Sequence, residues 1–246
     1  MKIFDRFEVV DCYPALYIPE NKILVISDIH LGLEGIMSEN GYYMPKFQFE
    51  EIENDLVDIF EKVNVSEIVI NGDLKHMFSR SSKSEWKEVN KMLDFLKDKV
   101  EKITLIKGNH DNYLIYIAKK HDVDLEDYIK RDDILITHGH RKFDVEDDVE
   151  YIIIGHDHPV LSLHDKVGVE ETIPCFIYGE CRNKKIVMVP AFSKLSGGCR
   201  VNRIKYNEDR VFSPVMRGCD INEFRAIGVE REEQLCLKFP KIKEVD

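Results

Sequence analysis

Short apolar runs recur along the first two thirds of the chain, and residues that can bind a metal follow each run at once. The runs cover residues 23–27, 67–70, 103–106, 134–137 and 151–154. Runs of this length, rich in Ile and Val and closed by turn residues, are typical of buried strands. The pattern therefore predicts five core strands that end at one polar edge.

Between the first strands, apolar residues recur at three- and four-residue spacing, which predicts helices. One helix is expected at about 48–63 and a short one at about 112–120. Another begins at the capping-box pattern Ser82-x-x-Glu85, with an inward stripe at Trp86, Val89, Leu93, Leu96 and Val100. Residues 31–46 are rich in glycine and are interpreted as a long active-site loop.

The later part of the chain predicts strands without helices between them. Strands are expected near 125–130, 173–179 and 185–189, and residues 6–18 fit a hairpin or edge strand. Strands separated by helices, followed by strands alone, predict an α/β sandwich of two mixed sheets packed face to face with helices outside.

No repeat or linker divides the chain, so we expect a single domain over residues 1–246. Its catalytic core would cover about residues 20–205 and a C-terminal extension about 206–246. The last forty residues show no clear periodicity. The stretch 219–236 would either fold over the site or form a homodimer contact, and the sequence leaves both open.

The composition is that of an ordinary globular protein, with 43% hydrophobic and 33% charged residues. No apolar stretch approaches the roughly 18 residues of a membrane span, and the N-terminus has no apolar signal region. We therefore expect a cytoplasmic protein without membrane contact. The net charge of −11 argues against the broad basic face that duplex DNA requires.

The six cysteines contain no Cys-x-x-Cys pair, which argues against a zinc ribbon or a thioredoxin-like site. In a cytoplasmic protein, buried free thiols are the expected state. Few glutamines and many Lys, Glu and Ile residues are a weak thermophile signal, and an internal disulfide is the alternative that this signal leaves open.

The residues after the apolar runs are candidate ligands of a metal centre. They are Asp28, His30, Asp73, Asn109, His138, His156 and His158. Carboxylate, amide oxygen and imidazole together suit Mn²⁺, Fe²⁺, Ni²⁺ or Zn²⁺, and the absence of thiolate disfavours a closed structural zinc site. Each motif alone is more common as an ordinary turn or histidine, but their recurrence after five strands predicts one shared site.

Asp73, in the turn Asn71-Gly72-Asp73, is interpreted as the carboxylate shared by two divalent ions. Two ions about 3.5–4 Å apart activate water near neutral pH and neutralise phosphate oxygens, which is the chemistry of phosphoester hydrolysis. A nearby imidazole can stabilise the transition state or protonate the leaving group.

Taken together, the motifs resemble the full signature of the calcineurin-like metallophosphoesterases. They are Asp28-x-His30, Gly72-Asp73-x-x-His76, Gly108-Asn109-His110-Asp111, His138-Gly139-His140 and Gly155-His156-x-His158. The resemblance covers about residues 22–158 and implies a four-layer αββα sandwich and two divalent ions, with Mn²⁺ expected first.

The resemblance also implies roles for single residues. Asp28, His30, Asp73 and His158 would hold one ion, and Asp73, Asn109, His138 and His156 the other. His110 matches the histidine that contacts the phosphate, and Asp111 the acid that orients its ring. Either His138 or His140 could reach a metal, and the family pattern favours His138.

His76 and the segment 190–202 resemble compact SbcD-related phosphoesterases of archaea. This likeness implies a phosphodiesterase that acts on single-stranded DNA, RNA or nucleotides. The alternatives are a phosphomonoesterase, a phosphodiesterase of small metabolites or cyclic nucleotides on the same centre, and a non-catalytic scaffold. Intact motifs argue against the scaffold.

Further residues are expected to meet the substrate or to support the core. Asn109, His140 and Arg80 are predicted substrate contacts, and His110, His76 and Asp111 are the predicted catalytic residues. Tyr42 and Tyr43 would stack on a base or pack within their loop. Met77 and Phe78 are expected in the core rather than at the substrate.

Overall fold

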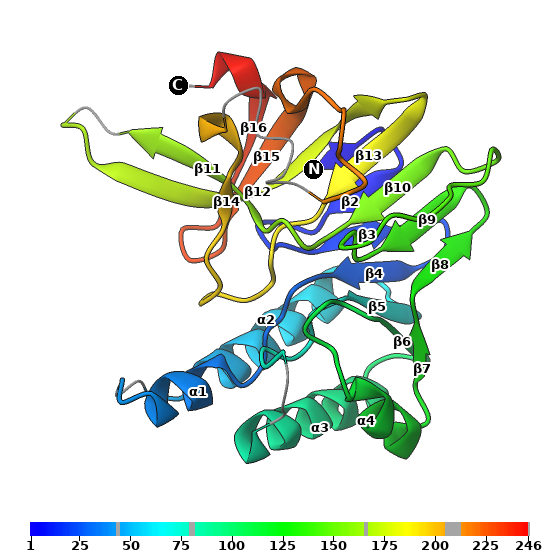
Figure 1. The fold of residues 1–246 in the computed structure, drawn as a ribbon, viewed down its shortest axis with the longest axis vertical. Helices are drawn as coiled ribbons and strands as arrows, with labels where there is room; N and C mark the ends of the chain where they lie inside the picture. The colour runs from blue at the N-terminus through cyan, green and yellow to red at the C-terminus, as the bar shows by residue number, and fades with distance from the viewer. Residues whose placement is uncertain (43–44, 79–81, 165–166, 205–212, 246) are drawn as a thin grey trace.

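The computed structural model describes residues 1–42, 45–78, 82–164, 167–204 and 213–245. Within these ranges the chain forms two mixed sheets packed face to face, with helices against the first sheet (Figure 1). The predicted α/β sandwich of two mixed sheets flanked by helices is confirmed.

The first sheet is antiparallel from β1 to β4 and parallel from β4 to β7. In spatial order it contains β1 (Lys2–Ile3), β2 (Phe7–Val9), β3 (Leu16–Ile18), β4 (Ile23–Ile26), β5 (Glu67–Asn71), β6 (Lys102–Ile106) and β7 (Asp124–Glu126).

The second sheet holds the strands of the later part of the chain. Its main path runs through β14 (Cys199–Arg200), β11 (Pro159–His164), β12 (Glu170–Cys181), β13 (Lys184–Met188), β10 (Tyr151–Ile154), β9 (Ile134–Thr137) and β8 (Tyr128–Arg131). From the C-terminal region, β15 (Arg225–Glu230) pairs with β12, and β16 (Leu235–Lys241) pairs with β15. The predicted strand 125–130 is thus two strands, β7 and β8, one in each sheet.

The apolar runs are continuous because both faces of each central strand are covered. In β4, Leu24 and Ile26 face a cluster shared with the helices. Val25 belongs instead to the cluster between the sheets, together with Ile136 and Ile153 of the second sheet. Side-chain alternation along each strand therefore fills two apolar layers at once.

The helices lie against the outer face of the first sheet (Figure 1). They are α1 (Leu33–Glu39), α2 (Gln48–Lys62), α3 (Lys83–Lys97) and α4 (Leu114–His121). Ser82 caps α3 by accepting a hydrogen bond from the backbone N of Glu85, as the capping-box pattern predicts. On the outer face of the second sheet, the fourth layer in the described residues consists of loops and the short 3-10 helices η1 (Val201–Arg203), η2 (Ile221–Glu223) and η3 (Ile242–Glu244).

Two expectations about the helical layer were wrong. The loop expected at 31–46 contains helix α1, and Glu34 of this helix accepts hydrogen bonds from the backbone N atoms that begin α2. Trp86 was expected in the buried stripe of α3 but is 36% exposed. Glu85 is buried beside it because its carboxylate accepts a hydrogen bond from the backbone N of Met77 (2.6 Å).

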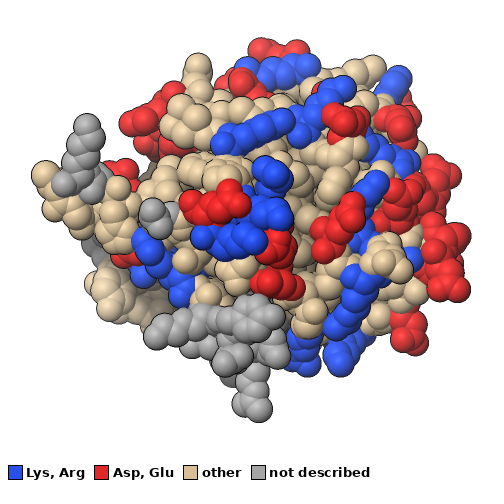
Figure 2. Space-filling model, turned by 90° about the horizontal axis from the view of Figure 1, so that it is seen from above, with Lys and Arg blue, Asp and Glu red and all other residues tan. Residues whose placement is uncertain are grey.

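Charges of both signs cover the surface. On the face seen from above, Lys and Arg side chains are interspersed with Asp and Glu side chains (Figure 2). Glu223, for example, lies between Lys241 and Lys243 and forms an ion pair with each. Among the described residues, no helix combines the length and apolar character needed to cross a membrane.

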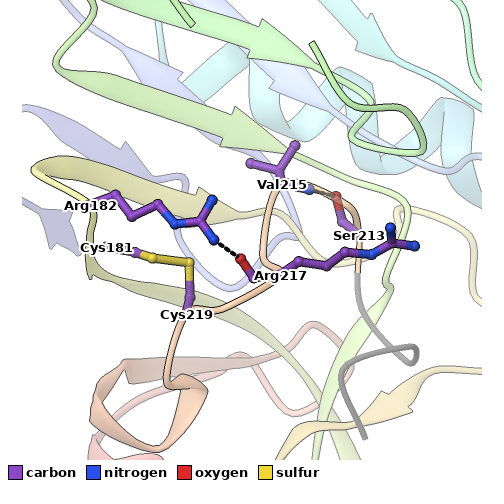
Figure 3. Close-up of a disulfide and its surroundings, with 6 residues drawn as sticks. All are labelled: Cys181, Arg182, Ser213, Val215, Arg217 and Cys219. Atoms are coloured by element: carbon purple, nitrogen blue, oxygen red, sulfur yellow. Dashed lines mark hydrogen bonds between the residues drawn. A yellow bond between two sulfur atoms is a disulfide. The ribbon is translucent and has the colours of Figure 1, made fainter. Parts of the chain in front are cut away.

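A disulfide joins Cys181 at the end of β12 to Cys219, 38 residues later (Figure 3). The expectation of free thiols is therefore wrong for this pair, whereas Cys12, Cys175, Cys199 and Cys236 are free. Beside the disulfide, Arg182 donates a hydrogen bond to the carbonyl oxygen of Arg217 (Figure 3). No local pattern in the sequence indicates this pairing, because the two cysteines come together only when the chain returns after η1.

We expect the double substitution Cys181→Ser/Cys219→Ser to lower the free energy of unfolding by about 2–4 kcal/mol, since the bond restricts a long loop in the unfolded chain. Urea unfolding under non-reducing conditions measures this difference. Cys199→Ser, which changes a free thiol, is the matched control. Equal stability of the double variant and the parent protein would show that the bond adds nothing.

Candidate metal centre

The carboxyl ends of the parallel strands from both sheets meet at one place. Strands β4, β5 and β6 are parallel neighbours, as are β9, β10 and β13. The two sheets are joined at this edge, because Asp28 Oδ2 accepts a hydrogen bond from the backbone N of His156 (3.0 Å). A bridge between Ser27 and Ala191 makes a second connection. Residues that follow five different strands are thereby brought to one site, as ligands gather at strand ends in open α/β sheets.

The predicted ligands fall into two adjacent clusters. Within each cluster, the ligand atoms of its three Asp and His residues lie within 4.8 Å of one another. One cluster contains Asp28, His30 and His158, and the other contains Asp73, His138 and His156. Asn109 adjoins the second cluster, with its Oδ1 3.2 Å from His138 Nε2. The structure thus brings together all seven predicted ligands, and Asp73, which the resemblance assigns to both ions, belongs to the second cluster.

Hydrogen bonds to backbone carbonyls orient two of the imidazoles. His138 Nδ1 donates to the carbonyl oxygen of Asn71 (3.0 Å), and His158 Nδ1 donates to that of Gly197 (3.0 Å). A carbonyl oxygen only accepts, so the proton of each neutral ring is fixed on Nδ1 and Nε2 keeps its lone pair. This is the arrangement that metal-ligating histidines have, and the donor set therefore fits a divalent ion.

Buried carboxylates give the centre a strong affinity for positive charge. Burial disfavours the charged form of His138, but Asp28 and Asp73 outweigh burial and raise its pKa to about 9. Burial is likewise outweighed at His158, where Asp28 raises the pKa to about 9. Divalent cations compete with protons for such ligands, so this electrostatic field also favours metal binding.

The backbone is strained at most of the predicted ligands. Five of the seven have a left-handed conformation, with φ between 44° and 72°: Asp28, His30, Asp73, His156 and His158. Non-glycine residues adopt this region infrequently and at an energetic cost, and such residues concentrate at functional sites. The surrounding structure holds the ligands in place rather than leaving them in relaxed turns.

Two motif glycines allow the strand ends to approach one another closely. A Cβ atom at Gly72 would collide with the ring of His138, and one at Gly108 would collide with the carboxylate of Asp73. Gly72 also has a left-handed backbone (φ 84°). These glycines are therefore required by the packing of the ligands themselves.

His110 and His76 form a third group beside the first cluster, together with His30. The rings of His76 and His110 are stacked, with centroids 5.6 Å apart. His110 Nδ1 donates a hydrogen bond to the backbone carbonyl of His76, which leaves Nε2 facing Asp73 Oδ2 at 3.9 Å. The ring of His110 thus presents a nitrogen to the space beside the metal ligands.

Asp111 does not contact the ring of His110 as the resemblance implied. Its buried carboxylate accepts hydrogen bonds from the backbone N atoms of Gly108 (2.9 Å) and Lys75 (3.4 Å). The side chain is turned toward these amides, and the carbonyl oxygen of His76 takes the orienting position. Asp111 therefore stabilises the loop that carries Asn109 and His110.

The remaining predicted substrate contacts have different outcomes. The ring of His140 lies 5.2 Å from that of His138, and His138 belongs to a cluster that could hold a metal ion whereas His140 belongs to neither. Burial, with the nearby His138, lowers the pKa of His140 to about 4. Arg80 and Tyr43 lie outside the described residues, and Tyr42 is exposed.

Several supporting residues were missed by sequence reasoning. The hydroxyl of Ser27 donates to Asp28 Oδ2 (2.6 Å). Asp157, between two ligand histidines, accepts a hydrogen bond from the backbone N of Ser213 (2.8 Å). Ser27 and Asp157 are adjacent in sequence to predicted ligands, and this adjacency was the available signal. Ser213 belongs to no motif and lies far from the ligands in sequence.

Comparisons with known proteins show the family and the fold of this chain. The family model described as calcineurin-like phosphoesterase matches residues 21–160. The nuclease MPE of Pseudomonas putida has a similar fold, with a TM-score of 0.65 and 16% identity over 97% of this chain and 98% of that chain. The phosphoesterase YfcE of E. coli is less similar, with a TM-score of 0.44 and 12% identity over 89% of this chain and 98% of that chain. A search of curated protein sequences finds no match.

The family match contains all seven predicted ligands and spans more than half of the 246 residues. Its matched segment is also the part of the chain that forms both clusters. The protein therefore belongs to the calcineurin-like phosphoesterase family.

Proposed function

We propose that this protein is a dinuclear metal-dependent phosphodiesterase that hydrolyses phosphodiester bonds in nucleic acid or nucleotides. The observation that carries the proposal is the pair of adjacent Asp/His clusters, one of which contains Asp73, with the His76–His110 pair beside them. A nuclease of Pseudomonas putida has the same fold, which is consistent with nucleic-acid chemistry on this scaffold.

Each cluster would hold one divalent ion, with Asp73 shared between them. Asp28, His30 and His158 would complete one site, and Asn109, His138 and His156 the other. Bound ions would supply an activated water and positive charge for the phosphate oxygens. Mn²⁺ is the proposed native ion, because the mixture of oxygen and imidazole ligands suits it.

The side chains of the protein provide the remaining steps. His138 and His158 are held by carbonyl oxygens so that their Nε2 atoms face the centre. His110, oriented by the carbonyl of His76, would contact the phosphate and donate a proton to the leaving oxygen. Compact SbcD-related enzymes are the subfamily that we propose for this chain, on the basis of His76.

A substrate panel tests the proposal. Bis(p-nitrophenyl) phosphate, p-nitrophenyl phosphate, single-stranded oligonucleotides and nucleotides are assayed with Mn²⁺, Mg²⁺, Ni²⁺ and Zn²⁺, and bound metal is measured in the same samples. We expect two ions per chain and faster hydrolysis of diesters than of monoesters. A chain that binds no divalent metal, or that hydrolyses only monoesters, would contradict the proposal.

We expect His76→Asn to lower kcat/KM for diesters by about 10²-fold, the size of a lost proton-donating contact, and to affect monoesters much less. His76 lies against His110, where it can donate to the second ester group that only a diester carries. Parallel assays of bis(p-nitrophenyl) phosphate and p-nitrophenyl phosphate give the comparison. His164→Asn, at the end of β11, is the matched control. A larger loss for monoesters would reverse the role assigned to His76.

A further inference from the structure

Phe78 displays its aromatic ring at the edge of the metal centre instead of packing in the core, as the sequence led us to expect. Its side chain is 57% exposed. The ring packs edge-to-face against His110, with centroids 5.7 Å apart. His110 in turn lies 5.1 Å, ring to ring, from the metal-ligand candidate His30. The ring of His110 thus lies between the apolar ring of Phe78 and the predicted ligand His30.

The segment that carries Phe78 is fixed from both sides. The backbone N of Met77 donates to the buried carboxylate of Glu85 (2.6 Å), and the carbonyl oxygen of Met77 accepts from the buried Lys75 ammonium. Asn112, in the loop after His110, donates to the carbonyl oxygen of Phe78 (2.9 Å). Bonds to charged groups are strong, so the backbone that carries Phe78 is held in place, and the ring packs against His110. This order before binding reduces the entropic cost of binding a ligand.

We propose that Phe78 is a stacking platform for the nucleobase adjacent to the scissile phosphodiester. The inference rests on the proposed function and restricts the class of substrate to phosphodiesters that carry a nucleobase. An aromatic side chain stacks on any base, so the platform would accept nucleotides without strong sequence preference.

Chemistry and charge favour a base over other apolar groups. A phosphate placed between His110 and the ligand clusters has its ester substituents beside Phe78, since the ring touches His110 itself. The net charge of the chain is −11. Grip on a long phosphate backbone is therefore weak, and stacking on a single base supplies the recognition instead.

Dinucleotides with and without bases test the platform. Three substrates are compared: thymidylyl-thymidine and the two dinucleotides in which one of its nucleosides is replaced by an abasic tetrahydrofuran sugar. Each is assayed with the parent protein, Phe78→Ala, Phe78→Trp and Tyr116→Ala. Tyr116 is an exposed aromatic residue of α4 and provides the control. We expect Phe78→Ala to lower the ratio of kcat/KM for the full dinucleotide to that for one abasic counterpart by about 5- to 150-fold, the range of a lost base stack. Phe78→Trp and Tyr116→Ala should keep the parent ratio.

Two results would overturn the platform. Unchanged kcat/KM for all three substrates in Phe78→Ala means that the ring does not contact a base, and an equal loss for all three substrates means that Phe78 only positions His110. A binding measurement separates this inference from the proposed function: quenching of 2-aminopurine in a dinucleotide, with Ca²⁺ present, reports stacking without turnover. Quenching that disappears in Phe78→Ala supports the platform even if no diester is hydrolysed, and absence of quenching in the parent protein rejects it.

Discussion

Replacing Asp73 with asparagine should lower kcat for diester hydrolysis by about 10³-fold or more, because a two-metal centre supplies several kcal/mol of transition-state stabilisation. Burial disfavours the charged form of this carboxyl, but the nearby imidazole of His138, whose Nε2 lies 3.4 Å from Asp73 Oδ2, outweighs burial and lowers its pKa, so Asp73 is a carboxylate. In the parent protein, Asp73 Oδ1 accepts a hydrogen bond from the backbone N of His110 (2.8 Å). Asparagine has the same shape and retains an oxygen that can accept this bond. It lacks the negative charge that two cations would share.

The measurement combines kcat for bis(p-nitrophenyl) phosphate at saturating Mn²⁺ with the metal content of the dialysed protein. We expect fewer than two ions per chain in Asp73→Asn and an unchanged circular dichroism spectrum. Asp127→Asn, in the exposed loop between β7 and β8, is the matched control. A variant that keeps two ions and the parent rate would remove Asp73 from the centre.

Replacing His110 with alanine should reduce hydrolysis by an amount that depends on the leaving group. Loss of a general acid costs about 10²–10⁴-fold. The loss should approach 10⁴-fold for a dinucleotide, whose alkoxide leaving group needs a proton, and about 10²-fold for bis(p-nitrophenyl) phosphate, because p-nitrophenolate leaves without one. The geometry supports this role, since His110 Nδ1 is engaged by the His76 carbonyl and Nε2 is directed to the site.

Metal content should be unchanged in His110→Ala, which separates it from Asp73→Asn. Added imidazole should restore part of the dinucleotide activity, because it can replace the missing proton donor. An equal loss for the two leaving groups would indicate that His110 binds the phosphate without protonating the leaving oxygen. Unchanged rates for both substrates would exclude His110 from catalysis.

The strands and the clustering of the candidate ligands at their ends could be predicted because the signals for both are local. Strands such as β4 and β10 are covered on both faces, and this leaves a continuous apolar run that ends where the polar ligands begin. The helix that Ser82 caps was predicted for the same reason, since a capping box lies within four residues. Each of these features depends on neighbours in sequence.

Helix α1 and the exposure of Phe78 were not predictable in this way. The glycines in residues 31–46 predicted a loop. Glu34 of α1 is instead buried, because it accepts hydrogen bonds from the backbone N atoms of Phe47 and Gln48 at the beginning of α2, which lie more than ten residues later in the chain. The apolar character of Phe78 predicted a core residue. Its exposure results from contacts of its backbone with Asn112 and of the preceding residue with Glu85.

The sequence by itself determined where the core strands lie along the chain, which residues are candidate metal ligands and the class of reaction, because these depend on residue types at fixed local spacings. Only the tertiary structure decided which carbonyls orient His138 and His158, that Asp111 supports a loop rather than a ring, and that Cys181 pairs with Cys219. These contacts join segments far apart in the chain. They arise when two sheets close against each other, and no local pattern of apolar and polar residues records them.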